Sequence, residues 1–199
     1  MDARIVRTRE ALIAAIDEAL HGDADKLPTI TELCQSAGVS RPTFYQHFRD
    51  VPALVAAAGV DELLKTFAAA STSPEKKTAW ADGAPRVIRD LLSALFAEGR
   101  YYRRVLEESD TYAFQERVIG YLTERMLIYT PLGDARGSGS DDVHLRRIAA
   151  FLAAGATWLV VGWIKLGPDR PSPTAAADEV SQLIITSIAA QAANEGIAQ

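Results

Sequence analysis

Two helix starts lie close together near the N-terminus, and a glycine-bearing turn separates the short helices that follow them. The run Thr29-Ile30-Thr31-Glu32 is a capping box, in which the threonine hydroxyl and the glutamate carboxylate each bind the other residue's backbone amide. Ser40 is a second N-cap residue. Gly38, between Ala37 and Val39, can take the positive φ that a tight turn requires. These features predict a helix-turn-helix.

The rest of the chain has the apolar spacing of helices, without an alternating run that would predict a strand. We therefore expect an all-α protein of about nine helices, with Pro85 kinking the fifth helix or marking its start. The three glycines between Pro131 and Ser140 predict a loop. The remaining helices are expected over about residues 5–20, from a cap at Asp50, from a cap at Ser73 with Pro74, and over about 101–108, 110–129, 142–166 and 174–193.

Composition limits the class of protein. The chain has 199 residues, of which 48% are hydrophobic, so it can bury a sizeable core. Its one cysteine, Cys34, cannot form an internal disulfide, and the first residues lack the apolar core of a secretory signal, so we expect a cytoplasmic protein. The net charge of -5 argues against a protein that coats nucleic acid by bulk charge.

The uncharged run from Ile148 to Ile164 could suggest a membrane span, since it approaches the lower length limit of about 17 residues. Gly155 and Gly162 interrupt it, Lys165 ends it, and the sequence has no second candidate. We interpret the run as a helix buried on most sides, in a core or a dimer interface, and expect no membrane partner.

The second helix of the helix-turn-helix carries side chains suited to the major groove of DNA. Arg41 stands at its start, and a guanidinium can bind guanine O6 and N7 together. Gln46 can bind an adenine edge. The N-termini of the two helices attract phosphate, so Thr29 and Ser40 are placed for backbone contacts. The complete set of expected DNA contacts is Thr29, Thr31, Ser40, Arg41, Pro42, Thr43, Tyr45, Gln46, His47, Arg4 and Arg7.

The run from Ala37 to Phe48, preceded by Thr29-Ile30-Thr31-Glu32-Leu33, resembles the TetR family of transcriptional regulators. The family pattern is a small residue, glycine, a hydrophobic residue and serine, followed by an aromatic pair and a closing aromatic. The resemblance at motif level covers about residues 8–55. It implies a homodimer with a DNA-binding domain over 1–49 and a ligand-binding and dimerisation domain over 50–199. The dimer is expected to bind a palindromic operator as a repressor, and a small, mostly apolar effector is expected to release it from the DNA.

Two features depart from that family's pattern. Many members place a lysine at the start of the fourth helix, where it holds a phosphate, but here Val51, Pro52 and Ala53 follow Asp50. Residues 1–50 also contain more acidic than basic side chains. Affinity for DNA would then depend on local charge, because Arg4, Arg7 and Arg9 form a basic arm and residues 35–49 contain no acid.

The C-terminal part is rich in aromatic residues, and the resemblance implies a cavity for a small effector among its helices. The expected effector contacts are Trp80, Phe114, Tyr121, Phe151, Thr157 and Trp158. The expected dimer contacts are Gly155, Gly162, Trp163, Ile184 and Ile188, since small residues allow helices to approach closely.

Two other classes of protein remain as alternatives. An enzyme has little support, because His21, His47 and His144 lack metal-ligand spacing and no nucleophile elbow or phosphate-binding loop is present. We accordingly expect no catalytic residues, no metal and no cofactor. A helical interaction protein whose helix-turn-helix is structural is the other alternative, and DNA binding would distinguish it.

Overall fold

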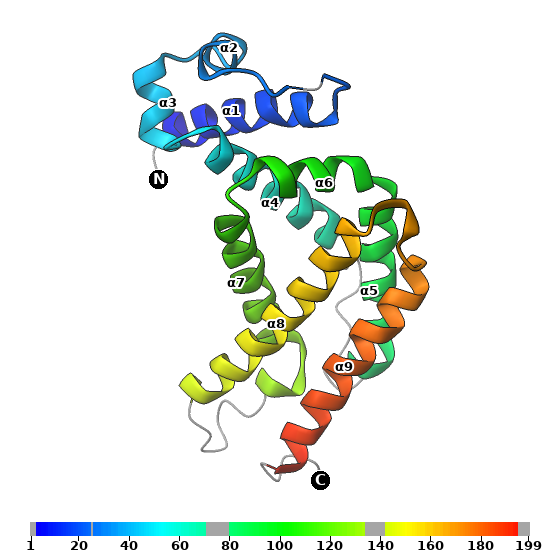
Figure 1. Ribbon diagram of the computed structural model, residues 1–199. Coiled ribbons are helices and arrows are strands. Elements are labelled where there is room, and N and C mark those ends of the chain that lie inside the picture. Colours follow the sequence, from blue (N-terminus) through cyan, green and yellow to red (C-terminus); the bar gives the residue numbers. More distant parts are fainter. Residues whose placement is uncertain (1–2, 25, 71–79, 134–141, 195–199) are drawn as a thin grey trace. The chain divides into compact units, whose positions relative to one another are not determined.

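The computed structural model describes residues 3–24, 26–70, 80–133 and 142–194, and within these ranges it contains nine α-helices, two short 3-10 helices and no strand (Figure 1). The predicted all-α class is therefore confirmed. The expected cap at Ser73 with Pro74, and most of the expected loop over 131–140, lie outside the described residues. The elements are α1 (Ala3–His21), α2 (Ile30–Ser36), α3 (Arg41–His47), α4 (Val51–Ala70), α5 (Trp80–Ala97), α6 (Gly99–Glu108), α7 (Thr111–Tyr129), η2 (Pro131–Gly133), α8 (Asp142–Lys165), η3 (Gly167–Asp169) and α9 (Pro173–Asn194).

The chain forms two compact units. The first contains Met1–Lys65 and Glu98–Gln115, and the second contains Thr66–Ala97 and Glu116–Gln199. Helices α4 and α7 each begin in the first unit and continue into the second. The functional division between residues 1–49 and 50–199 stays a prediction.

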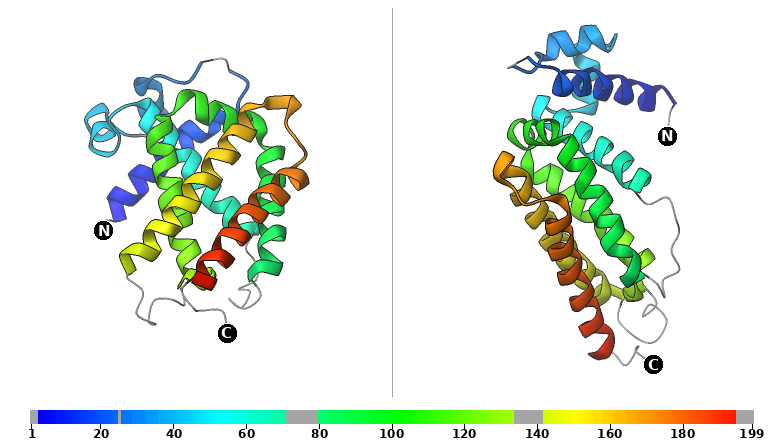
Figure 2. Two further views of the ribbon diagram at one scale, coloured as in Figure 1. Left: turned by 60° about the horizontal axis from the view of Figure 1, so that its bottom comes forward. Right: turned by 90° about the vertical axis from the view of Figure 1, so that its right-hand side faces the viewer.

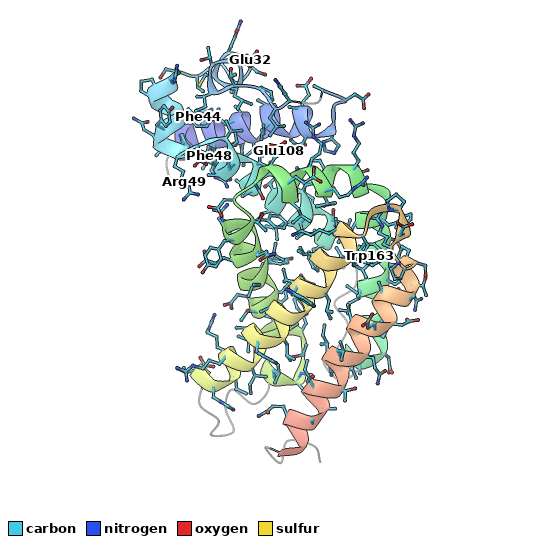
Figure 3. All side chains as sticks on the ribbon, in the orientation of Figure 1. Glu32, Phe44, Phe48, Arg49, Glu108 and Trp163 are labelled. Atoms are coloured by element: carbon cyan, nitrogen blue, oxygen red, sulfur yellow. The ribbon has the colours of Figure 1, made fainter. Side chains whose placement is uncertain are left out.

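The core of the first unit holds α1, α2 and α3 together. Leu12, Ile16 and Leu20 lie on one face of α1 and are completely buried, because their spacing of four places them along a single stripe. Phe44 of α3 is also completely buried, and Phe48 follows it at 7% exposure (Figure 3). The angle between the short helices is thus set by large side chains and not by the turn alone.

Helix α6 belongs to the same unit and holds the end of α1. The guanidinium of Arg104 donates hydrogen bonds to four carbonyl oxygens at and after that end. These carbonyls belong to Ala19 (3.0 Å), Leu20 (3.3 Å), Gly22 (2.9 Å) and Ala24 (3.0 Å). The last carbonyls of a helix have no partner within it, so Arg104 supplies the partner that α1 lacks.

A second contact between α6 and α1 is more deeply buried. The hydroxyl of Tyr101, 2% exposed, donates a 2.7 Å hydrogen bond to Oδ1 of Asp17. Burial and this neighbouring carboxylate raise the pKa of Tyr101 far above its ordinary value, so the phenol stays protonated and remains a donor. The ring of Tyr101 also stacks on His21, with 4.4 Å between the ring centroids.

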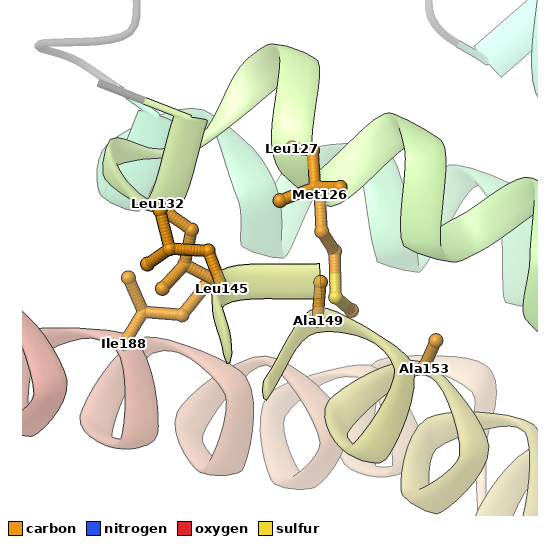
Figure 4. Packing of buried hydrophobic residues seen from close by; sticks show 7 residues of the cluster. All are labelled: Met126, Leu127, Leu132, Leu145, Ala149, Ala153 and Ile188. Carbon is orange, nitrogen blue, oxygen red and sulfur yellow. The ribbon is translucent and has the colours of Figure 1, made fainter. Parts of the chain in front are cut away.

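In the second unit, α5 and α8 both pack against α9, and these helices lie side by side in the views of Figure 2. Pro85 lies inside α5, within its second turn. One cluster of the core joins α7, η2, α8 and α9 (Figure 4). Its buried members are Met126, Leu127, Leu132, Leu145, Ala149, Ala153 and Ile188.

Helix α8 is, among the described helices, the one long and apolar enough to cross a membrane. Leu145, Ala149, Ala153 and Val161 are buried along one of its faces. The helix contacts α9 and η2, so one face of α8 belongs to the core of the second unit. The expectation of a helix buried on most sides is confirmed only in part, because Phe151, Gly155, Trp158 and Gly162 leave another face of α8 exposed.

Candidate nucleic-acid interface

The local geometry of the helix-turn-helix agrees with the sequence prediction. The Thr29 hydroxyl accepts a hydrogen bond from the Glu32 amide at 3.4 Å, and the Thr29 amide donates to the Glu32 carboxylate at 2.8 Å. This confirms the capping box. The Thr29 amide and hydroxyl lower the pKa of Glu32, so its carboxylate is charged at neutral pH. Gly38 has a φ of 66°, as the turn requires.

Helix α3 starts at a confirmed N-cap. The hydroxyl of Ser40 accepts a hydrogen bond from the Thr43 amide at 3.3 Å, and the two hydroxyls lie 2.8 Å apart. The side chain of Thr43 is therefore engaged with the cap, and it is half-buried. A DNA contact by Thr43 would use its methyl group or the hydrogen-bonding capacity that its hydroxyl keeps beside Ser40, since a hydroxyl has one donor and two acceptor lone pairs.

The outer face of α3 presents polar side chains. Arg41, Pro42 and Gln46 are exposed, and Tyr45 is 51% exposed while its ring meets that of Phe44 edge to face. Phe44 anchors the opposite face in the core. The first two turns of α3 therefore display Arg41, Tyr45 and Gln46 away from the unit's core, as major-groove reading requires.

The remaining expected DNA contacts lie on α1, at the start of α2 and at the two ends of α3, and their exposures differ. Thr29, Thr31, Ser40, Arg4 and Arg7 are exposed. His47 is half-buried beside Phe48, with 6.5 Å between the ring centroids. Arg9, from the same basic arm, places its guanidinium 5.7 Å from the centre of the Phe48 ring. One residue of the arm is therefore packed on the core of the first unit.

The basic residue after α3 has acidic partners. Nε of Arg49 donates to Asp50 at 3.0 Å, and Nη2 donates to Asp110, at the α6–α7 turn. Figure 3 labels Arg49 directly after α3. The sequence offered no indication of the Arg49–Asp110 pair, because the two residues are 61 positions apart.

The six expected effector residues divide between the two units and, within the second unit, between different surroundings. Phe114 belongs to the first unit and is buried, whereas the other five belong to the second. Phe151 and Trp158 are 78% and 74% exposed on α8, but Thr157 is buried on another face and donates to the Ala153 carbonyl at 2.8 Å. In the second unit, Tyr121 packs on Phe67, and Trp80 packs against the Met126 to Ile188 cluster.

A cavity of about 150 Å³ lies in the second unit, next to the end of α8. None of the six expected effector residues lines it. Its walls are formed by Leu92, Leu159, Val160, Trp163, Leu166, Pro171, Ala176, Glu179 and Val180. Pockets for drug-sized ligands are roughly 300–1,000 Å³, so this cavity holds only a small molecule unless its helices separate.

The expected dimer residues divide between surface and core. Gly155 and Gly162 lie on the exposed face of α8, and apart from the adjacent backbone of α8 itself no described atom lies within 4 Å of where their Cβ atoms would be. Ile188 is completely buried, and Ile184 packs on the same cluster. Trp163 is 6% exposed, and its indole N–H donates to the Pro171 carbonyl at 2.9 Å.

Comparisons with known proteins identify the fold. No family model matches the sequence, and the search of curated proteins found no match either. Among solved structures, the dihydroxyacetone kinase operon activator DhaS aligns with a TM-score of 0.52 and 17% identity, over 91% of this chain and 96% of its own. At this identity the match shows the fold, and it confirms the resemblance to TetR-family regulators at that level.

Two further solved structures align over most of the chain. The fatty acid degradation regulator FadR from Bacillus halodurans has a TM-score of 0.49 and 15% identity, over 92% of this chain and 95% of its own. The transcriptional regulator FadR from Bacillus subtilis, in complex with stearoyl-CoA, has a TM-score of 0.43 and 14% identity, over 92% of this chain and 98% of its own. All three matched proteins are regulators by name, not enzymes.

Proposed function

We propose that this chain is a cytoplasmic transcription regulator that binds a palindromic operator as a homodimer, and that a small, mostly apolar effector releases it. The observation that carries the proposal is the outer face of α3. Arg41, Tyr45 and Gln46 are displayed there by a capped helix whose inner face is anchored by Phe44. No acidic residue lies between Gln35 and Arg49 to repel phosphate.

The acidic total charge supports binding as a dimer. A protein of net charge -5 gains little nonspecific affinity for a polyanion, so a single short reading helix binds weakly. Two copies that place their α3 helices about 34–36 Å apart, or a multiple of it, would contact successive major grooves together. Sequence-specific binding then requires both subunits and a matched site.

The exposed face of α8 supports an assignment of the dimer contact. Phe151, Gly155, Trp158 and Gly162 follow one another at spacings of four, three and four, which place them in one stripe. The two aromatic side chains are exposed, and the two glycines leave room for a neighbouring helix. We therefore assign Phe151 and Trp158 to the subunit interface together with the glycines, in place of the effector site, since large exposed aromatic groups are typical interface anchors.

The effector is proposed to bind within the second unit and to act by shifting a conformational equilibrium. A ligand that prefers a conformation with a different spacing of the two α3 helices lowers the affinity for DNA. We propose that the regulator represses, so that the effector induces transcription. DhaS is an activator by name, which makes activation the alternative.

Selection of DNA from a random library by the purified full-length protein tests the proposed function. We expect one enriched palindromic sequence, bound by two subunits and released steeply by added salt. Failure to enrich any sequence by a protein that still dimerises would favour the helical interaction protein instead. Transcription in vitro from a promoter that contains the enriched site then separates the two directions of control, because a repressor lowers the transcript and an activator raises it.

A further inference from the structure

Arg49 joins two aspartates that each cap a helix. Oδ1 of Asp50 accepts from the Ala53 amide at 2.8 Å at the start of α4, and Oδ1 of Asp110 accepts from the Ala113 amide at 3.2 Å at the start of α7. The other carboxylate oxygen of each aspartate binds the Arg49 guanidinium. The Arg49 guanidinium therefore connects the N-termini of α4 and α7. We call this pair of contacts, with Asp50 and Asp110, the Arg49 bridge.

Two other contacts hold α4 against the α6–α7 segment. The backbone amide of Asp110 donates to the Pro52 carbonyl at 3.3 Å, beside the Arg49 bridge. Further along α4, Gly59 lies so close to Val105 and Phe114 that a Cβ atom there would be 2.5 Å and 3.2 Å from their side chains. The start of α4 is thus fixed by the charged bridge, and its middle by close packing.

The bridge lies where the two continuing helices begin. Both α4 and α7 start in the first unit and run into the second, at Lys65–Thr66 and at Gln115–Glu116 respectively. Arg49 is also only two residues after His47, the last residue of α3. The bridge thus joins the starts of the two helices that continue into the second unit, and α3 ends beside one of them.

We propose that Arg49 is a positioning residue, which holds α3 in its DNA-reading orientation relative to the starts of α4 and α7. The inference rests on the proposed function. It gives Arg49 no phosphate contact, although Arg49 is the arginine nearest the end of α3. The side chain of Arg49 is 68% exposed, so the bridge adds little to global stability and acts mainly on orientation.

The substitution Asp110→Asn distinguishes a positioning role from a phosphate contact. Asparagine caps helices about as well as aspartate, so α7 keeps its cap while Arg49 loses a charged partner. If Arg49 positions α3, the variant binds the selected operator more weakly, by roughly 2- to 30-fold. If Arg49 instead contacts phosphate, removal of its competing carboxylate strengthens binding, and that result would overturn the proposal.

Asp61→Asn is the matched control. It removes the same charge from the same unit, and Asp61 pairs with Lys65 at 3.1 Å on α4, away from α3. Removal of a negative charge by itself would strengthen DNA binding slightly in both variants. We expect Asp110→Asn to bind the operator more weakly and Asp61→Asn not to do so. The affinity of Asp110→Asn should depend on salt as that of the unaltered protein does, because no phosphate contact is lost.

Hydrogen exchange in the full-length protein tests the bridge without DNA. We expect Asp110→Asn and Arg49→Gln to accelerate exchange of the amides of residues 41–56, and Asp61→Asn to leave them unchanged. Arg49→Lys should restore protection only in part, because an ammonium lacks the planar set of donors that reaches both carboxylates. Unchanged exchange in both bridge variants would overturn the proposal. Failure of the unaltered protein to select any DNA would instead reject the proposed function, and exchange would still decide whether Arg49 positions α3.

Discussion

Gly59 of α4 faces Val105 of α6 so closely that a Cβ atom on Gly59 would lie 2.5 Å from Cγ1 of the valine. Val105 is completely buried and β-branched, so its methyl groups cannot turn away cheaply. A glycine inside a helix is ordinarily unfavourable, by roughly 1 kcal/mol relative to alanine. Here the close approach of two helices is the reason for its presence.

Gly59→Ala should therefore destabilise the protein in spite of its better helix propensity. Overpacking costs about 1–3 kcal/mol, and improved propensity returns roughly 1 kcal/mol of that. We expect a net loss of up to about 2 kcal/mol in the free energy of unfolding, measured by urea denaturation. The second substitution Val105→Ala should cost less in the Gly59→Ala background than alone. A Gly59→Ala variant as stable as the original protein would contradict the close contact.

Arg104→Met should weaken the attachment of α1 to α6. The variant keeps an apolar side chain of similar length, but the four carbonyls that Arg104 binds at the end of α1 lose their shared donor. We expect the free energy of unfolding, measured by thermal or urea denaturation, to fall by about 1–3 kcal/mol. Arg103→Met is the matched control, because Nε of Arg103 bonds only within α6, to the Gly99 carbonyl at 3.2 Å. Equal losses from the two variants would show that the carbonyl contacts of Arg104 contribute nothing specific.

Arg41→Ala should relax base recognition. A bidentate contact between arginine and guanine contributes about 1–3 kcal/mol of discrimination, so the variant should tolerate every base at one position of each half-site. Selection from a random library, followed by titration of single-base variants, measures this effect. Arg146→Ala, which removes the same charge from an ion pair with Glu124 in the second unit, should leave the selected sequence unchanged. Unaltered selectivity in Arg41→Ala would exclude base reading by this residue.

Trp158→Glu should convert the dimer into monomers. The indole is 74% exposed in the single chain, and its burial in an interface would make it an anchor of the dimer. Its loss should weaken the free energy of dimer association by about 2 kcal/mol or more, which is roughly a 30-fold rise in the dimer dissociation constant. Sedimentation equilibrium measures the change. Tyr112→Glu offers a control, since Tyr112 is 75% exposed on α7 and lies outside the proposed face. A Trp158→Glu protein that dimerises like the original would place the interface elsewhere.

Acid should weaken the first unit through its lowered carboxylate pKa values. The amide of Ala113 and then Arg49 lower the pKa of Asp110, and Arg100 lowers that of Asp23, below the ordinary value of 3.8. The folded protein therefore binds fewer protons than the unfolded chain near this pH, so these carboxylates stabilise it at neutral pH and lose that effect as the pH falls below about 4. Because the bridge is exposed, we expect only a small difference in urea midpoint between the original protein and Asp110→Asn at neutral pH, and this difference should shrink as the pH falls below about 4. A constant difference would contradict the lowered pKa of Asp110.

Local sequence was sufficient to predict the helix-turn-helix. The capping box of Thr29 and Glu32, the Ser40 cap and the positive φ of Gly38 all depend on partners at most three residues away. Such interactions are present in any conformation that starts the helix, so their residue types predict them directly. The burial of Phe44 and the outward direction of Arg41 then follow from helical periodicity.

The roles of the distant arginines were decided only by the tertiary structure. Arg49 and Asp110 are 61 positions apart, and Arg104 reaches carbonyls 80 to 85 positions before it. A charged side chain has the same local pattern whether it faces phosphate, solvent or a helix end. Its partner depends on which helices the core brings together.

Helix α8 shows the same limit for apolar residues. It is apolar on most sides, so its periodicity predicts a helix without saying which face is buried. Thr157 and Trp163 are buried in the structure, whereas Phe151, Gly155 and Trp158 lie on the surface. The sequence thus determined that these residues share a helix. The neighbours of that helix in the tertiary structure determined which of the residues are available to a second subunit, because burial depends on the elements that pack against each face.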